Sequence, residues 1–147
     1  MTQTGVTDSS SVKDLVVQGL QKYRRIDVLL NNVGRFKPRF VQPMSEDVWN
    51  SQININLNIL YLTCHHILPI MEQRASGGAV VNVSSIAGLR YIGKPQVAYS
   101  ATKAAIMQFI KTTAVESGLI YTSYTRELAD LYAPGGDEAA YMKKRDH

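Results

Sequence analysis

Apolar and polar positions along the chain follow the periods of helices and strands in alternation. A polar start at Asp8, suited to capping a helix, precedes apolar residues three or four apart, which predicts an amphipathic helix over residues 8–23. The short apolar run over residues 26–30 stops at Asn31 and predicts a strand buried on both faces, as in parallel sheets. Residues 35–43 hold two prolines and three basic side chains and are expected to form a loop.

The longest helical pattern begins at Ser45. Two acidic residues follow in the first turn, where they favour the helix dipole, and apolar residues then recur every three or four positions as far as Met71. Pro69 is expected to bend this helix, and the sequence Ser-Gly-Gly at residues 76–78 is expected to end it.

A second strand, a loop and a further helix follow. Residues 79–83 predict a buried strand that ends at Ser84 and Ser85, residues 86–97 a loop, and residues 98–117 a helix. Helices that alternate with strands are typical of a doubly wound α/β fold, in which ligands bind outside the carboxyl ends of the strands. Asn31 and Ser85 lie at two such ends, so we expect an active site there.

Composition narrows the class of protein. Of 147 residues, 45% are apolar and 19% charged, which fits one globular domain over residues 1–147 and excludes a disordered polyelectrolyte or a membrane protein. The net charge of +4 is scattered, so no nucleic-acid partner is expected. Cys64 is the single cysteine and therefore cannot form an internal disulfide, so we expect a cytoplasmic location. Cys64, His65 and His66 are adjacent and do not have the spacing of metal ligands, so we expect no metal.

Tyr99 and Lys103 lie four residues apart on the predicted last helix and therefore project from one face. In isolation this spacing is weak evidence, because chance supplies about 0.4 such pairs in a chain of this composition. A surface pair on an exposed helix is the alternative to a catalytic pair. The neighbouring motifs favour the catalytic one.

Four motifs in order along the chain resemble the short-chain dehydrogenase/reductase family. They are the strand-end Asn31-Asn32-Val33-Gly34, the helix residue Asn56, the strand-end Ser85, and Tyr99 followed by Lys103. The match extends from about Val6 to Glu116. It implies a Rossmann-like doubly wound parallel sheet, an NAD or NADP cofactor, and hydride transfer between a secondary alcohol and a carbonyl compound of small or medium size.

The resemblance assigns roles to the matching residues. Tyr99 would be the acid/base, and Lys103 would supply the cation that lets a phenol work at neutral pH and would bind the nicotinamide ribose. Ser85 would orient the reacting oxygen, and Asn56 would hold a water that relays protons. Asn56 also lies on an apolar helix stripe, where a polar side chain needs a partner.

Further residues would contact the cofactor. Asn31 and Gly34 would line the adenosine side of the cleft, where the missing side chain of Gly34 allows close approach. After Glu116 the family's sixth strand is not found, and the tail of its Pro-Gly turn is matched at Gly118, Ile120 and Thr122.

The chain also departs from the family pattern at its start. No glycine-rich phosphate loop is found, and Gly5 stands where the family's adenine-contacting aspartate is expected. The sequence therefore predicts a partial sheet without the N-terminal, sixth and final strands, and it does not choose between NAD and NADP.

Two hypotheses stay open at this point. The first is an oxidoreductase that retains Asn56, Ser85, Tyr99 and Lys103. The second is a non-catalytic interaction protein that keeps the family's dimerising helices, 45–75 and 98–117. Both imply a homo-oligomer, and only the first implies a small alcohol or ketone substrate.

Overall fold

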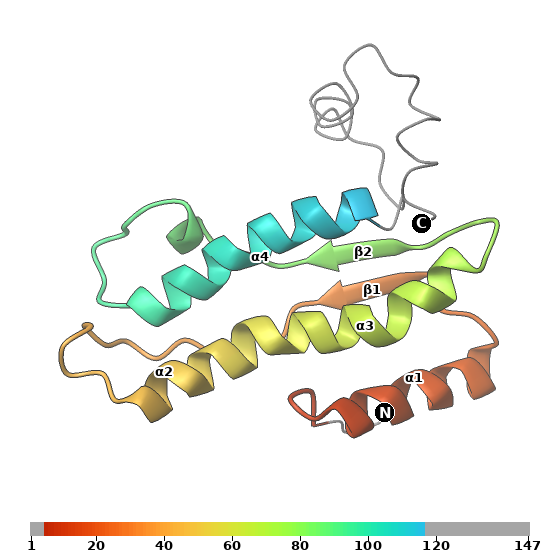
Figure 1. Cartoon of the computed structure of the whole chain (residues 1–147), viewed down its shortest axis with the longest axis horizontal. Coiled ribbons are helices and arrows are strands. Elements are labelled where there is room, and N and C mark those ends of the chain that lie inside the picture. The colour runs from red at the N-terminus through yellow and green to blue at the C-terminus, as the bar shows by residue number, and fades with distance from the viewer. Residues whose placement is uncertain (1–4, 117–147) are drawn as a thin grey trace, which may run out of the picture. The chain divides into compact units, whose positions relative to one another are not determined.

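The structure is a computed structural model that describes residues 5–116 (Figure 1). Its first helix, α1 (Ser9–Tyr23), begins as the sequence predicts, because the Asp8 carboxylate accepts a hydrogen bond of 2.7 Å from the backbone N–H of Ser11. The helix ends at Arg24, whose φ of 67° is left-handed.

The two predicted strands form a parallel pair. Strand β1 (Val28–Asn31) lies beside β2 (Ala79–Asn82), and Val28 opposes Ala79 while Asn31 opposes Asn82. In the described part of the chain this is a sheet of two strands, part of the predicted doubly wound sheet. The register brings the carboxyl ends of both strands, with their polar residues, to the same edge.

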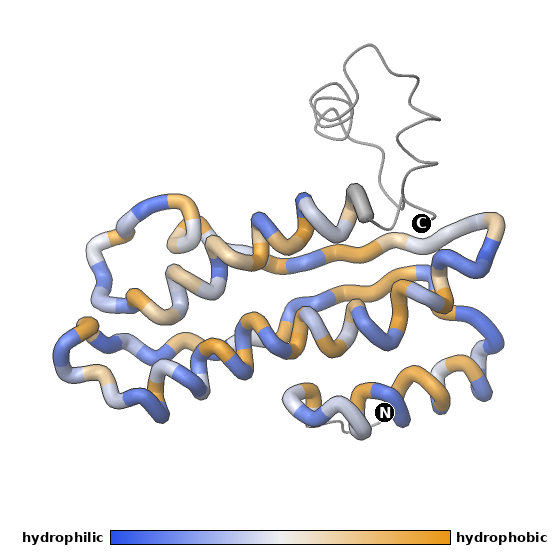
Figure 2. The backbone as a smooth tube through the Cα atoms, in the orientation of Figure 1, coloured by the Kyte–Doolittle hydropathy of each residue, from blue (hydrophilic) through white to orange (hydrophobic). Residues whose placement is uncertain are grey.

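The prediction that the first strand is buried on both faces is wrong. Leu29 is buried, but its neighbours Val28 and Leu30 are 59% and 60% exposed. Side chains alternate between the faces of a strand, and the long helix packs against the Leu29 side (Figure 1). Among residues 5–116 nothing covers the other face, although both strands are apolar throughout most of their length (Figure 2).

The long central helix is three segments instead of one. Helix α2 (Glu46–Ile53), capped by the Ser45 hydroxyl, leads into a π-helical turn (Asn54–Asn58), and α3 (Ile59–Glu72) follows. The helix departs from α geometry at this π turn, and α3 continues through Pro69, where we expected a bend. A π turn carries one residue more than an α turn and is frequent at functional sites.

Helix α4 (Val97–Glu116) matches the predicted last helix within one residue at each end. A short 3₁₀ turn, Ile86–Gly88, lies between β2 and α4. The core lies between α1, α3 and β1, and α4 adds Ala98 and Ile106 to the buried set. The other buried apolar residues include Val12, Val16, Leu29, Ile59, Leu60, Ile67 and Met71.

The chain divides into two compact units, residues 1–109 and 110–147, and of the second the structure describes residues 110–116. The single domain over residues 1–147 stays a prediction. Gly118, Ile120 and Thr122, proposed to contact the cofactor, lie outside the described residues. Within residues 5–116, no helix is both long enough and apolar enough to cross a membrane.

Candidate active site

Lys103 reaches from α4 to the end of β2. Its side chain is buried, 4% exposed, and its Nζ donates a hydrogen bond of 2.7 Å to the carbonyl oxygen of Val83. No carboxylate among the described side chains forms an ion pair with it. Burial therefore lowers the pKa of Lys103 from its usual value.

Tyr99 lies one turn before Lys103 on the same face of α4. The Lys103 Nζ is 5.6 Å from the centre of the Tyr99 ring. The ring of Phe36, from the loop after β1, meets the Tyr99 ring edge to face, with centroids 5.6 Å apart and planes at 71°. The Tyr99 ring thus lies beside a buried cation and an aromatic ring.

Asn56 lies in the π turn and is 1% exposed. Its Oδ1 accepts a hydrogen bond of 2.8 Å from the backbone N–H of Arg35, and its Nδ2 donates to the carbonyl oxygens of Arg35 (2.9 Å) and Gln52 (3.0 Å). The prediction that this polar residue needs a partner is confirmed. The amide fixes the loop after β1 against the long helix.

Gly34 marks the point where the loop, the π turn and α4 converge. A Cβ atom at Gly34 would lie 2.9 Å from Asn56 Oδ1 and 3.6 Å from Lys103 Nζ. A small hollow, here called the lysine hollow, opens at this point. Its lining includes Asn31, Val33, Asn56 and Lys103.

Asn31, the last residue of β1, is engaged within the protein. Its Nδ2 donates to Asn82 Oδ1 (2.8 Å), across the strand pair, and its Oδ1 accepts from the Thr63 hydroxyl (2.8 Å). Its Nδ2 also lies 3.9 Å from the sulfur of Cys64. Cys64 is buried, which raises the pKa of its thiol to about 11. Asn31 thus ties the two strand ends to α3.

The serines after β2 have different partners. Ser84 Oγ donates to the carbonyl oxygen of Lys103 (2.8 Å), whereas Ser85 Oγ accepts from the backbone N–H of Ala87 (3.2 Å). A Cβ at Gly88 would lie 2.6 Å from the backbone carbon of Lys103. Ser84 and Gly88 therefore set the approach of α4 to the end of β2.

The structure therefore brings together Asn31, Asn56 and Lys103 around one hollow. Gly34 lies close to Asn56 and Lys103, and Tyr99 lies beside Lys103. Ser85 follows β2 and precedes the 3₁₀ turn, and its hydroxyl accepts a hydrogen bond from the backbone N–H of Ala87. Sequence reasoning missed the positioning residues Phe36, Ser84 and Gly88. The adjacent pair Ser84-Ser85 and the glycine three residues later were visible signals, but Phe36 lay in a loop without a pattern.

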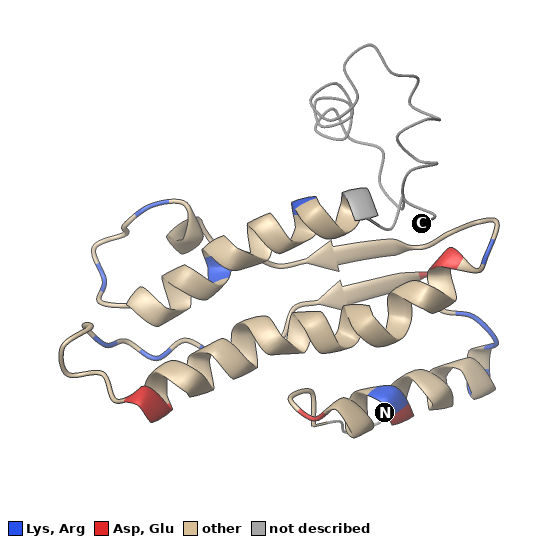
Figure 3. Ribbon diagram, viewed as in Figure 1, with Lys and Arg blue, Asp and Glu red and all other residues tan. Residues whose placement is uncertain are grey.

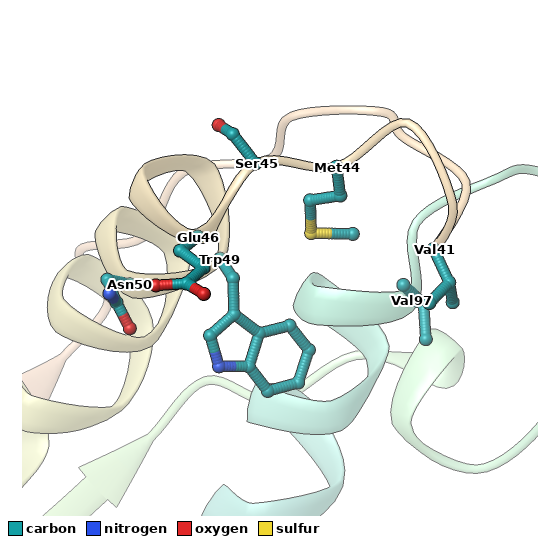
Figure 4. Close-up of a pocket in the computed structure, with 7 residues that line it drawn as sticks. All are labelled: Val41, Met44, Ser45, Glu46, Trp49, Asn50 and Val97. Atoms are coloured by element: carbon teal, nitrogen blue, oxygen red, sulfur yellow. The ribbon is translucent and has the colours of Figure 1, made fainter.

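A second hollow lies between α2 and the start of α4. Met44 and Trp49 extend into it, and Val41 and Val97 lie on its other side (Figure 4). Its lining is mainly apolar, and Val41 and Val97 are shared with a third hollow, between the loops that follow β1 and β2.

Comparison with known proteins identifies relatives that match most of this chain. The profile of the short chain dehydrogenase family matches residues 1–119. A 3-oxoacyl-(acyl-carrier-protein) reductase FabG of Thermotoga maritima is 38% identical over 111 residues, 76% of this chain and 44% of the relative. A 3beta-hydroxysteroid dehydrogenase of Mediterraneibacter gnavus is 37% identical over 113 residues, 76% of this chain and 40% of the relative.

Solved structures agree. The crystal structure of a putative short-chain dehydrogenase/reductase from Burkholderia xenovorans matches with a TM-score of 0.77 and 40% identity, over 80% of this chain and 46% of that one. The chain thus spans less than half the length of these relatives. With a family profile that matches most of its residues, the chain belongs to the short-chain dehydrogenase family of oxidoreductases.

Proposed function

We propose that the protein is an NAD(P)-dependent oxidoreductase that interconverts a secondary alcohol and a carbonyl compound, with Tyr99 as the acid/base. The observation that carries this proposal is the buried ammonium of Lys103 beside the Tyr99 ring. These are the two residues to which the family resemblance assigns the acid/base and its cation. If Tyr99 and Lys103 were only a surface pair on an exposed helix, Lys103 would be expected to be exposed, not buried.

Lys103 and Gly34 have chemistry that fits a nicotinamide cofactor. Lys103 has three N–H donors, and among the described residues Val83 takes one of them, which leaves two for the ribose hydroxyls. Gly34 leaves open the space that a Cβ would fill. Lys103, Tyr99 and Gly34 would hold this part of the cofactor. When bound, the nicotinamide supplies or accepts the hydride.

The protein's own groups then handle the proton and the substrate oxygen. Tyr99 donates a proton to the carbonyl oxygen during reduction and accepts it during oxidation. Ser85 uses its hydroxyl as an acceptor for Ala87, so its own O–H stays free to donate to the same substrate oxygen. Asn56 holds the Arg35 backbone and the π turn in place, and we propose that it also positions a water on the way to Lys103.

The proposal extends to the setting of the protein. Helices α2, α3 and α4 would pair with a second copy of the chain, which the exposed rings of Trp49 and Tyr61 support. The single, unpaired Cys64 supports a reducing compartment, the cytoplasm. NAD and NADP both fit the groups described.

Isotope tracing tests the reaction. The full chain is incubated with NADH or NADPH carrying deuterium at C4 of the nicotinamide and with a panel of ketones, and the alcohol products are analysed by mass spectrometry. One deuterium on the carbinol carbon is expected, with loss of the product in Tyr99→Phe. Product formation that is independent of the cofactor, or that survives in Tyr99→Phe, would contradict the proposal.

A further inference from the structure

The two loops beside the candidate active site carry basic side chains and no acidic ones. Residues 35–43 contain two arginines and a lysine, and residues 86–97 contain one of each, without an aspartate or glutamate in either. Figure 3 shows basic residues along both loops, whereas acidic residues appear at the start of α2. Two loops that carry only positive charge attract negatively charged ligands.

The two loops are joined backbone to backbone. Arg39 and Gln96 form a parallel β-bridge, and the backbone N–H of Arg39 donates to the carbonyl oxygen of Pro95 (2.6 Å). This connection places Arg39 and Lys94 on the wall of the third hollow, here called the basic hollow. Its lining also includes Phe40, Tyr91, Ala87 and Ser100.

The lining of the basic hollow includes neighbours of two candidate reacting groups, Tyr99 and Ser85. Ser100 directly follows Tyr99, and Ala87 is the residue whose N–H is bonded to the Ser85 hydroxyl. Neither Arg39 nor Lys94 forms an ion pair with a carboxylate among the described side chains, and the Arg39 guanidinium donates to the carbonyl oxygen of Pro38 (3.0 Å). Among the described side chains, two cations without an ion-pair partner therefore face a hollow that is also lined by Ser100, the residue after Tyr99.

We infer that the substrate carries an anionic group, a carboxylate or a phosphate, which Arg39 and Lys94 bind in the basic hollow. An arginine fork and a lysine ammonium both form strong hydrogen bonds to such anions. The apolar part of the substrate would lie against Phe40 and Tyr91. The inference rests on the proposed function, because the hollow is a substrate site only if Tyr99 is the reacting group.

Binding and turnover are measured separately so that the two proposals can fail separately. The probes are 5-oxohexanoate and its methyl ester, and dihydroxyacetone phosphate and dihydroxyacetone, bound to the full chain with cofactor and followed by calorimetry. We expect at least one anion to bind about tenfold or more tightly than its neutral partner, since one charge-assisted hydrogen bond accounts for such a factor.

The variants Arg39→Gln and Lys94→Gln should each remove most of that preference and leave the neutral probe unchanged. Arg90→Gln is the matched control, because Arg90 lies in the same loop as Lys94 but does not line the basic hollow, and it should keep the preference.

Three outcomes would decide against one proposal or the other. Equal affinity for the anion and its neutral partner would overturn the inference, while turnover that depends on Tyr99 would leave the proposed function intact. Binding of the anion that depends on Arg39 but is never followed by reduction would contradict the proposed function, and the basic hollow would then be an anion site but not a substrate site. Binding could also depend on Arg39 and Lys94 only when the keto group is carried on an acidic protein. That result would overturn the inference of a small anionic substrate.

Discussion

The Nζ of Lys103 lies 5.6 Å from the centre of the Tyr99 ring while it donates a 2.7 Å hydrogen bond to the carbonyl oxygen of Val83. The distance to Tyr99 follows from the spacing of four residues on α4, and the hydrogen bond to Val83 depends on the position of the end of β2. The pair is therefore held correctly only while α4 stays in contact with the segment after β2, which Ser84 and Gly88 maintain.

Gly88→Ala should separate these elements. Its new Cβ would lie 2.6 Å from the backbone carbon of Lys103, and backbone does not move aside as a side chain does. We expect a loss of about 1–3 kcal/mol in the free energy of unfolding, measured by urea titration, because overpacking costs that much. Activity should fall with it.

Gly19→Ala is the matched control for this change. Gly19 lies in α1, and a Cβ there would meet the tip of Ile26, which follows the helix, at 3.9 Å, an ordinary van der Waals contact. Alanine favours a helix interior over glycine, so this variant should gain about 0.5–1 kcal/mol. Equal effects of the two substitutions would contradict the close approach of Gly88 to α4.

Asn56→Leu should destabilise the protein through the loop after β1. The backbone N–H and C=O of Arg35 would lose their partner, and each unpaired group costs about 1–3 kcal/mol where water is excluded. Asn58→Leu, in the same π turn but exposed, should change stability by less than about 0.5 kcal/mol. Similar losses from both, in chemical unfolding, would show that the Asn56 amide does not hold the loop.

The sequence predicts the elements that depend on local pattern. The cap at Asp8, the order of helices and strands, and the common edge of Asn31 and Ser85 follow from periodicity and from the parallel arrangement. The pairing of Tyr99 with Lys103 follows from helical spacing. These features need only neighbours within a few residues or a general rule for parallel sheets.

Features that depend on distant contacts were not predictable. The π turn around Asn56 has no hydrophobic period of its own, and its amide finds a partner 21 residues away, at Arg35. The exposure of Val28 and Leu30 could not be seen either, because an apolar residue in a strand does not show which layers cover it.

The carboxylate of Asp27 should make the stability of the folded protein sensitive to acid. Hydrogen bonds from Arg25 and Arg74 lower the pKa of its carboxyl from 3.8 to about 2. A lowered pKa in the folded state contributes stability that is present above about pH 4 and is lost as the pH falls toward 2. Asp27→Asn should make the unfolding midpoint depend less on pH between about 4 and 2. Asp14→Asn, on the exposed side of α1, should leave that pH dependence unchanged. Parallel curves for wild type and Asp27→Asn would disprove the role of this cluster.

Cys64 should be protected from alkylation. With a thiol pKa of about 11, the reactive thiolate is about one part in a thousand at pH 8, and burial limits access further. Iodoacetamide at pH 8 should therefore label the native protein very slowly and the urea-unfolded protein fully, as followed by mass spectrometry. Rapid labelling under native conditions would show that α3 does not bury the thiol.

The most direct measurement for the proposed function is the turnover number of Tyr99→Phe in the full chain. Phenylalanine keeps the ring contact with Phe36 and removes only the hydroxyl, so we expect unchanged thermal stability and nearly unchanged cofactor binding. Turnover should fall by about 10²–10⁴-fold, the usual contribution of a positioned acid/base. Tyr61→Phe, on the exposed side of α3, should stay at the wild-type rate. A Tyr99→Phe protein that turns over at the wild-type rate would show that Tyr99 is not the acid/base.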